Sequence, residues 1–234
     1  MWKIFIALLT LAPAAFAQEQ ATVYQAMRTV GRQLNRELVN HVISISGTNG
    51  NPQPATWTIL LDDPRARGGV REVEVQNDRI ISERTPLRQS VASSLGPVID
   101  TSKLNLDSSG AYTLAEQAAA TSHLTITGAD YTLHADERGN PIWIVALRRS
   151  DGEPAGKIFI GANHGTITRS EGLFVGGDHA IANNEETSAD AGDNDGDVNP
   201  IKQGIKDAFK KFGRDVKHDF YKVRRSFTDF FQDK

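Results

Sequence analysis

The chain contains no cysteine among its 234 residues, and this absence excludes several classes of protein. No disulfide framework can form, no thiolate can act as a nucleophile, and no lipid can be attached to a cysteine behind a leader peptide. An exported protein of this size without disulfides fits a bacterial periplasm or medium better than a eukaryotic secretory route. The fold must therefore be held together by packing and hydrogen bonds alone.

The N-terminal apolar run, Ile4–Leu11, is too short to span a bilayer. It follows the positive Lys3 and precedes the small-residue stretch Ala15–Ala17, which is the pattern of a signal peptide over residues 1–17. An uncleaved anchor is the alternative. We expect an exported protein that begins at Gln18 and is periplasmic or extracellular, either soluble or peripherally associated with a membrane.

Signals of catalysis are also scarce. The chain has no G-x-S-x-G motif, and its six histidines are scattered. His134 and Asp136 would share a strand face, with Glu137 next along the chain, but zinc sites usually take three or four ligands. We expect neither a metal nor a cofactor, and a non-enzymatic protein. An enzyme of unfamiliar type is a remaining alternative.

Three other groups of residues have a structural interpretation beside a functional one. His41 and His123 fall at matching positions after a helix, which fits either a paired site or capping of each helix. Trp57 and Trp143 fit core packing better than a recognition surface, because each lies among apolar neighbours. Asp193–Asp197 resembles half of a calcium loop, but a solvated acidic linker explains it better.

Two segments of the chain resemble each other. Asn51-Pro52 lies shortly before Trp57, and Asn140-Pro141 lies shortly before Trp143, each within a strand pattern. Such self-similarity indicates a duplicated unit. The predicted fold class is α+β, with two repeated units that each contain one helix and a small antiparallel sheet.

The hydrophobic pattern gives the bounds of these units. The first, 18–86, begins with a helix over 20–40, and the second, 111–175, with a helix over 114–121 that starts near Ser108. A connector over 87–110 separates them. Strands are expected at 41–46, 55–61, 68–75, 80–81, 124–127, 131–135, 142–147, 157–160 and 166–168. The strand 142–147 is almost continuously apolar, so burial of both its faces is expected, and each sheet could pack its free face against the sister unit.

The second unit resembles a PepSY-type domain. The resemblance lies in the strand Ile142–Leu147, the turn Ser150–Gly152, the strand Lys157–Ile160 and the turn Asn163–Gly165 before Thr166. The pattern departs from the family at Gly161-Ala162, where an Asp is common. The resemblance implies a helix paired with an antiparallel sheet, and binding or inhibition in the cell envelope without catalytic residues. The tandem arrangement is also similar to bacterial inhibitor proteins built from two helix-plus-sheet repeats.

Charge is distributed unevenly along the chain. Residues 201–234 contain ten Lys or Arg and five Asp, whereas residues 18–200 have a net charge of −9. The segment 176–200 is expected to be a disordered acidic linker, because it offers almost nothing to bury.

Residues 201–234 fit a basic amphipathic helix of the interfacial membrane type. We expect its apolar stripe to bind a membrane or partner through Phe209, Phe212, Val216, Phe220, Val223, Phe227 and Phe230. Attraction to anions would come from Lys206, Lys210, Lys211, Arg214 and Lys217. Docking on the protein's own sheet and self-association are the alternatives.

These features together predict a non-enzymatic binding protein of the cell envelope. Its paired units would bind a protein or peptide, and its tail would dock on an anionic membrane surface or a partner. An inhibitor or regulator of an envelope peptidase, acting through a strand edge or loop of the α+β body, is the alternative. Nucleic acid is not an expected partner of an exported chain with an acidic body.

Overall fold

The computed structural model describes residues 20–87, 91 and 96–173 of the chain. The expected signal peptide over 1–17, the acidic linker over 176–200 and the amphipathic helix over 201–234 lie outside these residues. All twelve residues named above for membrane or partner binding therefore also lie outside them.

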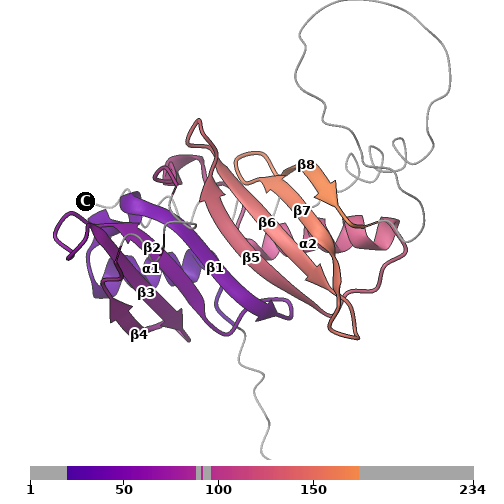
Figure 1. Cartoon of the computed structure of the whole chain (residues 1–234), viewed down its shortest axis with the longest axis horizontal. Helices are drawn as coiled ribbons and strands as arrows, with labels where there is room; N and C mark the ends of the chain where they lie inside the picture. Colours follow the sequence, from indigo (N-terminus) through magenta and orange to yellow (C-terminus); the bar gives the residue numbers. More distant parts are fainter. Residues whose placement is uncertain (1–19, 88–90, 92–95, 174–234) are drawn as a thin grey trace, which may run out of the picture.

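The described part folds as two consecutive halves, each with one α-helix followed by four strands (Figure 1). The first half consists of α1 (Val23–Gln33), the 3₁₀ helix η1 (Arg36–His41), β1 (Val42–Gly50), β2 (Trp57–Asp62), β3 (Val70–Gln76) and β4 (Arg79–Arg84). The second half consists of η3 (Thr101–Lys103), α2 (Ser108–Thr121), β5 (Gly128–Ala135), β6 (Pro141–Arg148), β7 (Pro154–Gly161) and β8 (Thr166–Glu171). The fold is α+β, as the sequence predicts.

All eight strands form one antiparallel sheet rather than two small ones. Their order is β4-β3-β2-β1-β5-β6-β7-β8, which is symmetric about the β1–β5 pair. β1 and β5 pair from Ser44 with His134 to Gly50 with Ala129. The two halves therefore join edge to edge, and the expectation that their sheets pack face to face is wrong.

Both helices lie behind the sheet in the view of Figure 1. α1 begins with a capping box, in which the Gln25 N–H donates to the Thr22 hydroxyl and the Thr22 N–H donates to the Gln25 side chain. It buries a stripe that includes Val23, Met27 and Val30. The Ala-rich α2 buries Ala111, Leu114, Ala115 and Ala119. Each helix thus covers the same face of the sheet.

The first helix ends earlier than the sequence pattern predicts. α1 stops at Gln33, and the rest of the expected span 20–40 belongs to the separate 3₁₀ helix η1. The Asn35 side chain accepts the N–H of Glu37 at 2.9 Å, so a local hydrogen bond starts a new turn where the α-helix would have continued. Leu38 keeps its place against the core from this second helix.

Two strand predictions are also wrong. Residues 124–127 form no strand, because the chain leaves α2 through His123 in the left-handed region, at φ 56°, and pairs only from Gly128 onward. β6 is not buried on both faces. Trp143, Val145 and Leu147 are buried on the helix side, whereas Ile142 and Ile144 are half-buried on the other.

The core is centred on three aromatic side chains contributed by both halves. Trp57, Tyr131 and Trp143 are buried, and their ring centroids lie 5.6 to 6.4 Å apart in edge-on or tilted contact. Each indole N–H donates to a backbone carbonyl just before a helix, to Ala21 at 2.6 Å and to Leu106 at 2.9 Å. The expected core role of both tryptophans is confirmed.

The N-terminal ends of the two helices meet at the junction of the halves. Asp107 caps α2 through the N–H of Ser108, and the same carboxylate oxygen accepts the N–H of Tyr24 from α1. The Ser108 hydroxyl accepts the N–H of Val23 and donates to Gln53. Burial raises the pKa of the Asp107 carboxyl, and these N–H donors oppose that rise. The start of α2 therefore also caps α1.

Because both tryptophans belong to one core, Trp57→Phe and Trp143→Phe should each destabilise the whole body. Each change leaves a small cavity and an unpaired carbonyl, so the free energy of unfolding should fall by about 1–3 kcal/mol. Urea unfolding followed by circular dichroism should show one transition in both variants. Two separate transitions, with only the mutated half shifted, would show that the halves are independent.

Candidate functional site

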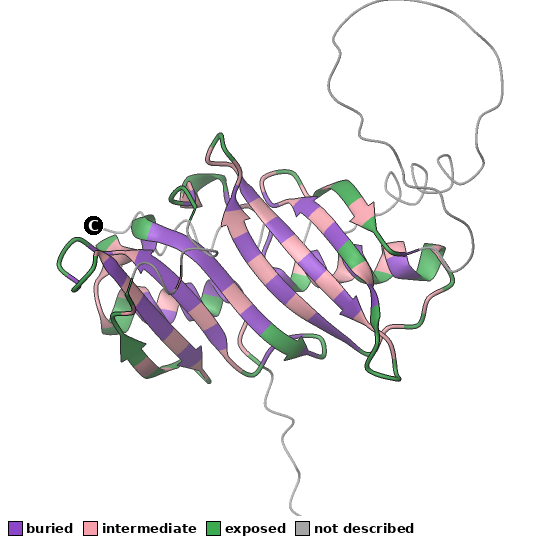
Figure 2. Ribbon diagram, viewed as in Figure 1, coloured by how far each residue is buried: buried purple, intermediate pink, exposed green. Residues whose placement is uncertain are grey.

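The face of the sheet opposite the helices, which Figure 2 views, carries rows of paired residues that run across the eight described strands. Directly paired residues of an antiparallel sheet lie on the same face. One such row is Ser82, Glu74, Thr58, Ser46, Thr132, Ile144, Phe159 and Arg169. We call this surface the open face.

The open face is apolar over the second half. Ile142 and Ile144 on β6 neighbour Phe159 on β7, and all three are half-buried. The Arg169 guanidinium lies 4.0 Å from the centre of the Phe159 ring, in a cation–π contact. Arg169 also pairs with Glu171 at 2.7 Å, so a partner can bury aliphatic and aromatic surface here beside an ion pair.

Small polar side chains occupy the middle of the open face, along the junction of β1 and β5. Ser44, Ser46, Thr58 and Thr132 supply hydroxyl groups that can donate or accept hydrogen bonds. His134 lies beside Ser44, and its Nδ1 is 3.0 Å from the Ala135 carbonyl oxygen. This strip offers hydrogen bonding at the centre of the surface.

One corner of the open face is covered by the connector between the halves. Ile43, Leu60 and Val70 form a small buried cluster, and Val91 of the connector packs against it. The chain then returns to the helix side, where the Ile99 N–H donates to the Val42 carbonyl at 2.7 Å. Among the residues that the structure describes, the connector covers only the β1–β3 end of the face.

The structure gives Asp136 a role in a turn. Its carboxylate accepts N–H groups of Arg138 and Asn140 between β5 and β6, and also the Asn140 amide. Burial opposes ionisation, but these donors outweigh it and lower the pKa of Asp136. Within the described part of the chain, no three His, Cys, Asp or Glu side chains gather in a way that could hold a metal ion.

The expected equivalence of His41 and His123 is wrong. His41 ends η1 directly before β1, whereas His123 follows α2 and lies in the chain five residues before β5 begins. The His123 N–H donates to the Ala120 carbonyl at 3.0 Å, as part of the helix end. The two histidines therefore do not make a matched pair.

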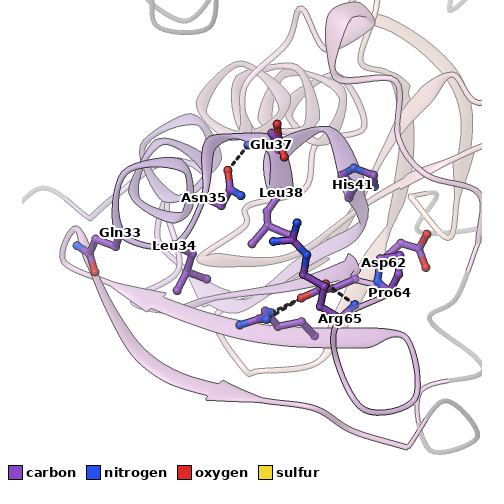
Figure 3. Close-up of a pocket in the computed structure, with 11 residues that line it drawn as sticks. Gln33, Leu34, Asn35, Glu37, Leu38, His41, Asp62, Pro64 and Arg65 are labelled. Atoms are coloured by element: carbon purple, nitrogen blue, oxygen red, sulfur yellow. Dashed lines mark hydrogen bonds and ion pairs between the residues drawn. The ribbon is translucent and has the colours of Figure 1, made fainter.

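A pocket of about 510 Å³ lies at the end of η1, beside the loop between β2 and β3 (Figure 3). One wall comes from α1 and η1 and the other from the β2–β3 loop and β3. The lining residues are Gln33, Leu34, Asn35, Glu37, Leu38, His41, Asp62, Asp63, Pro64, Arg65 and Arg71. Its volume is in the range of small-molecule sites in proteins.

The loop wall of the pocket is held by a buried carboxylate. Asp63 accepts the backbone N–H of Arg65 at 2.9 Å and two guanidinium contacts from Arg71 at 2.7 Å, and Arg71 also pairs with Glu83. Burial opposes ionisation of Asp63, but the Arg65 N–H and the Arg71 charge outweigh it and hold its pKa below the usual range. The loop therefore keeps a fixed shape.

Sequence reasoning missed both the open face and the pocket. The available signal for the open face was a second apolar set, Ile142 and Ile144, which was interpreted as double-sided burial. The sequence signal for the pocket is the pair of arginines in the loop Arg65-Ala66-Arg67, which no prediction above uses. Ala66 is buried, whereas Arg65 and Arg67 are exposed.

Comparisons give no relative from which a role could be transferred. No protein-family model, no curated protein and no solved structure matches this chain. Among the residues that the structure describes, no helix is both long enough and apolar enough to cross a bilayer.

Asp63→Asn should destabilise the protein in a pH-dependent way. Because the pKa of Asp63 is lowered in the folded state, ionised Asp63 stabilises the fold at pH values above the ordinary carboxyl pKa of about 3.9. This stabilisation is lost as the pH falls through the folded-state pKa. At pH 7 the variant should lose about 2 kcal/mol of unfolding free energy, and the difference from the native chain should shrink below about pH 4.

Urea unfolding at pH 7, 5 and 3 measures this effect. Asp78→Asn is the matched control, because Asp78 is an exposed carboxylate in the β3–β4 turn. A difference for Asp63→Asn that stays constant down to pH 3 would contradict the assigned ion pair.

Proposed function

We propose that this protein is an exported, non-enzymatic binding protein of the cell envelope that holds a protein or peptide on its open face. The observation that carries the proposal is the one-sided helical cover of the described sheet: both helices pack on one face (Figure 1), and the paired rows on the other carry hydroxyl, apolar and charged residues. Antiparallel sheets often leave one face to solvent, but the cluster of Ile142, Ile144 and Phe159 on that face is apolar surface that a partner can bury.

The size of the open face favours a macromolecular partner. Eight strands at a spacing of about 4.8 Å make the face about 34 Å wide, and strands of six residues make it about 20 Å long. The resulting area of about 700 Å² is close to the roughly 800 Å² that each partner buries in a typical stable interface. A small molecule would fill only a fraction of it.

The body is proposed to have arisen by duplication of a PepSY-like unit. Its support lies in details that the two halves share. Trp57 and Trp143 occupy the second strand of each half and donate to the residue before a helix cap. The strand pairs β3–β4 and β7–β8 each shift register next to the residue that pairs with the tryptophan, Val75 or Ile160.

Inhibition or regulation of an envelope peptidase is the second candidate function. It is favoured by the breadth of the open face across the eight described strands, which suits a folded enzyme surface better than an extended peptide. The paired units would then act together, because the hydroxyl strip at the β1–β5 junction lies in the middle of the interface. Binding to a membrane would be left to the tail.

Photo-cross-linking from the open face tests this function in cells that express the full chain. A photoreactive amino acid in place of Thr132 or Ile144 should give discrete cross-linked adducts, because both positions lie inside the proposed interface. The same amino acid in place of Glu116, which is exposed on α2, is the control. Equal adducts from Glu116, or none from either face position, would overturn the proposal.

The tail is proposed to dock on an anionic membrane surface or on a partner. Phe212→Asp with Phe220→Asp should abolish salt-sensitive binding to anionic vesicles, since each buried Phe contributes about 1.5–3 kcal/mol. Gln203→Asp with His218→Asp adds the same acidic groups on the opposite side of the expected helix and should weaken binding far less. Vesicle co-sedimentation in which both pairs behave alike would contradict the amphipathic stripe.

A further inference from the structure

The pocket beside η1 has chemistry that the proposed function does not use. We propose that it binds a small amphipathic carboxylate, with the carboxylate on Arg65 and the apolar part on Leu34 and Leu38. The pocket lies among the helices and the β2–β3 loop, away from the open face (Figure 3). It would thus be a second, independent binding site.

Arg65 is the charged group that the fold leaves available. The Arg65 backbone N–H is fixed by Asp63, while its side chain extends into the pocket toward Leu38 (Figure 3). Within the described residues, its guanidinium makes no hydrogen bond or ion pair, although its charge acts on nearby Asp63 and helps to lower the pKa of that carboxyl. A guanidinium on an anchored loop is well suited to hold a carboxylate through two parallel hydrogen bonds.

The other arginine of the pocket is already neutralised. Arg71 pairs with both Asp63 and Glu83, so it supports the loop and does not attract a ligand. Glu37 and Asp62 add negative charge to the lining. Both carboxylates point away from the Arg65 guanidinium in Figure 3, so a carboxylate ligand can reach that guanidinium, whereas a phosphate with two charges would be repelled more strongly.

The apolar part of the pocket is supplied by the helix wall. Leu34 and Leu38 are partly buried and pack against the main core, so they form a fixed apolar surface. Pro64 adds apolar surface from the loop. The ligand therefore needs an apolar chain next to its carboxylate, because burial of that chain supplies affinity that a single exposed ion pair would not.

Titration of the full mature chain with three six-carbon probes tests the proposal. Hexanoate, hexanol and hexylamine share the same chain and differ only in the head group. Hexanoate should shift the amide NMR signals of residues 34–41 and 62–66 in a saturable way and bind at least tenfold more tightly than the other two. Equal binding of all three, or no saturable shift with hexanoate, would overturn the proposal.

Two loop variants show whether Arg65 is responsible. Arg65→Gln should weaken hexanoate binding at least tenfold and leave hexanol binding unchanged. Arg67→Gln is the matched control, because Arg67 is exposed in the same loop but does not line the pocket. Unchanged hexanoate affinity in Arg65→Gln would refute the site. Cross-links from Thr132 should persist in this variant, so failure here is separable from failure of the open face.

Discussion

The pairing of β1 with β5 is the interaction on which the rest of the structure depends. It turns two four-stranded halves into one sheet and brings Trp57, Tyr131 and Trp143 into a single aromatic core. It also brings the start of α2 against the start of α1, where Asp107 accepts N–H groups from both helices. Because both helices then lie on the same side, neither covers the opposite face of the sheet, on which the proposed binding function rests.

The two proposed sites have different physical requirements. The open face is broad and mixed in polarity, so its affinity must come from many small contributions around Ile144 and Phe159. The pocket is small and depends on the guanidinium of Arg65, a residue whose backbone N–H is bonded to Asp63. The proteinaceous and small-molecule ligands would therefore not compete for the same side chains, and each site can be removed without the other.

Local patterns predicted the element types well but not how the halves meet. Alternation and turn residues were sufficient for β2, β3 and the Asn77-Asp78 turn, whose positive φ angles suit Asn and Asp. The β1–β5 pairing was out of reach, because it joins residues 79 to 90 positions apart. The half-buried Ile142 and Ile144 misled the prediction for β6, since an apolar run does not reveal that one face lacks a cover. Arg65 was missed because the sequence does not show that Arg65 lines the pocket whereas Arg67, two residues further along the same loop, does not.

A cross-link between the halves tests the central claim most directly, and a chain without cysteine makes it unambiguous. Ser46→Cys with Thr132→Cys places two thiols on directly paired residues of β1 and β5. The disulfide is expected to form in the folded protein without changing its circular dichroism spectrum. Thr132→Cys with Ile144→Cys, a neighbouring pair inside the second half, is the positive control. Cross-linking of the control but not of the β1–β5 pair would contradict the single sheet and the open face built on it.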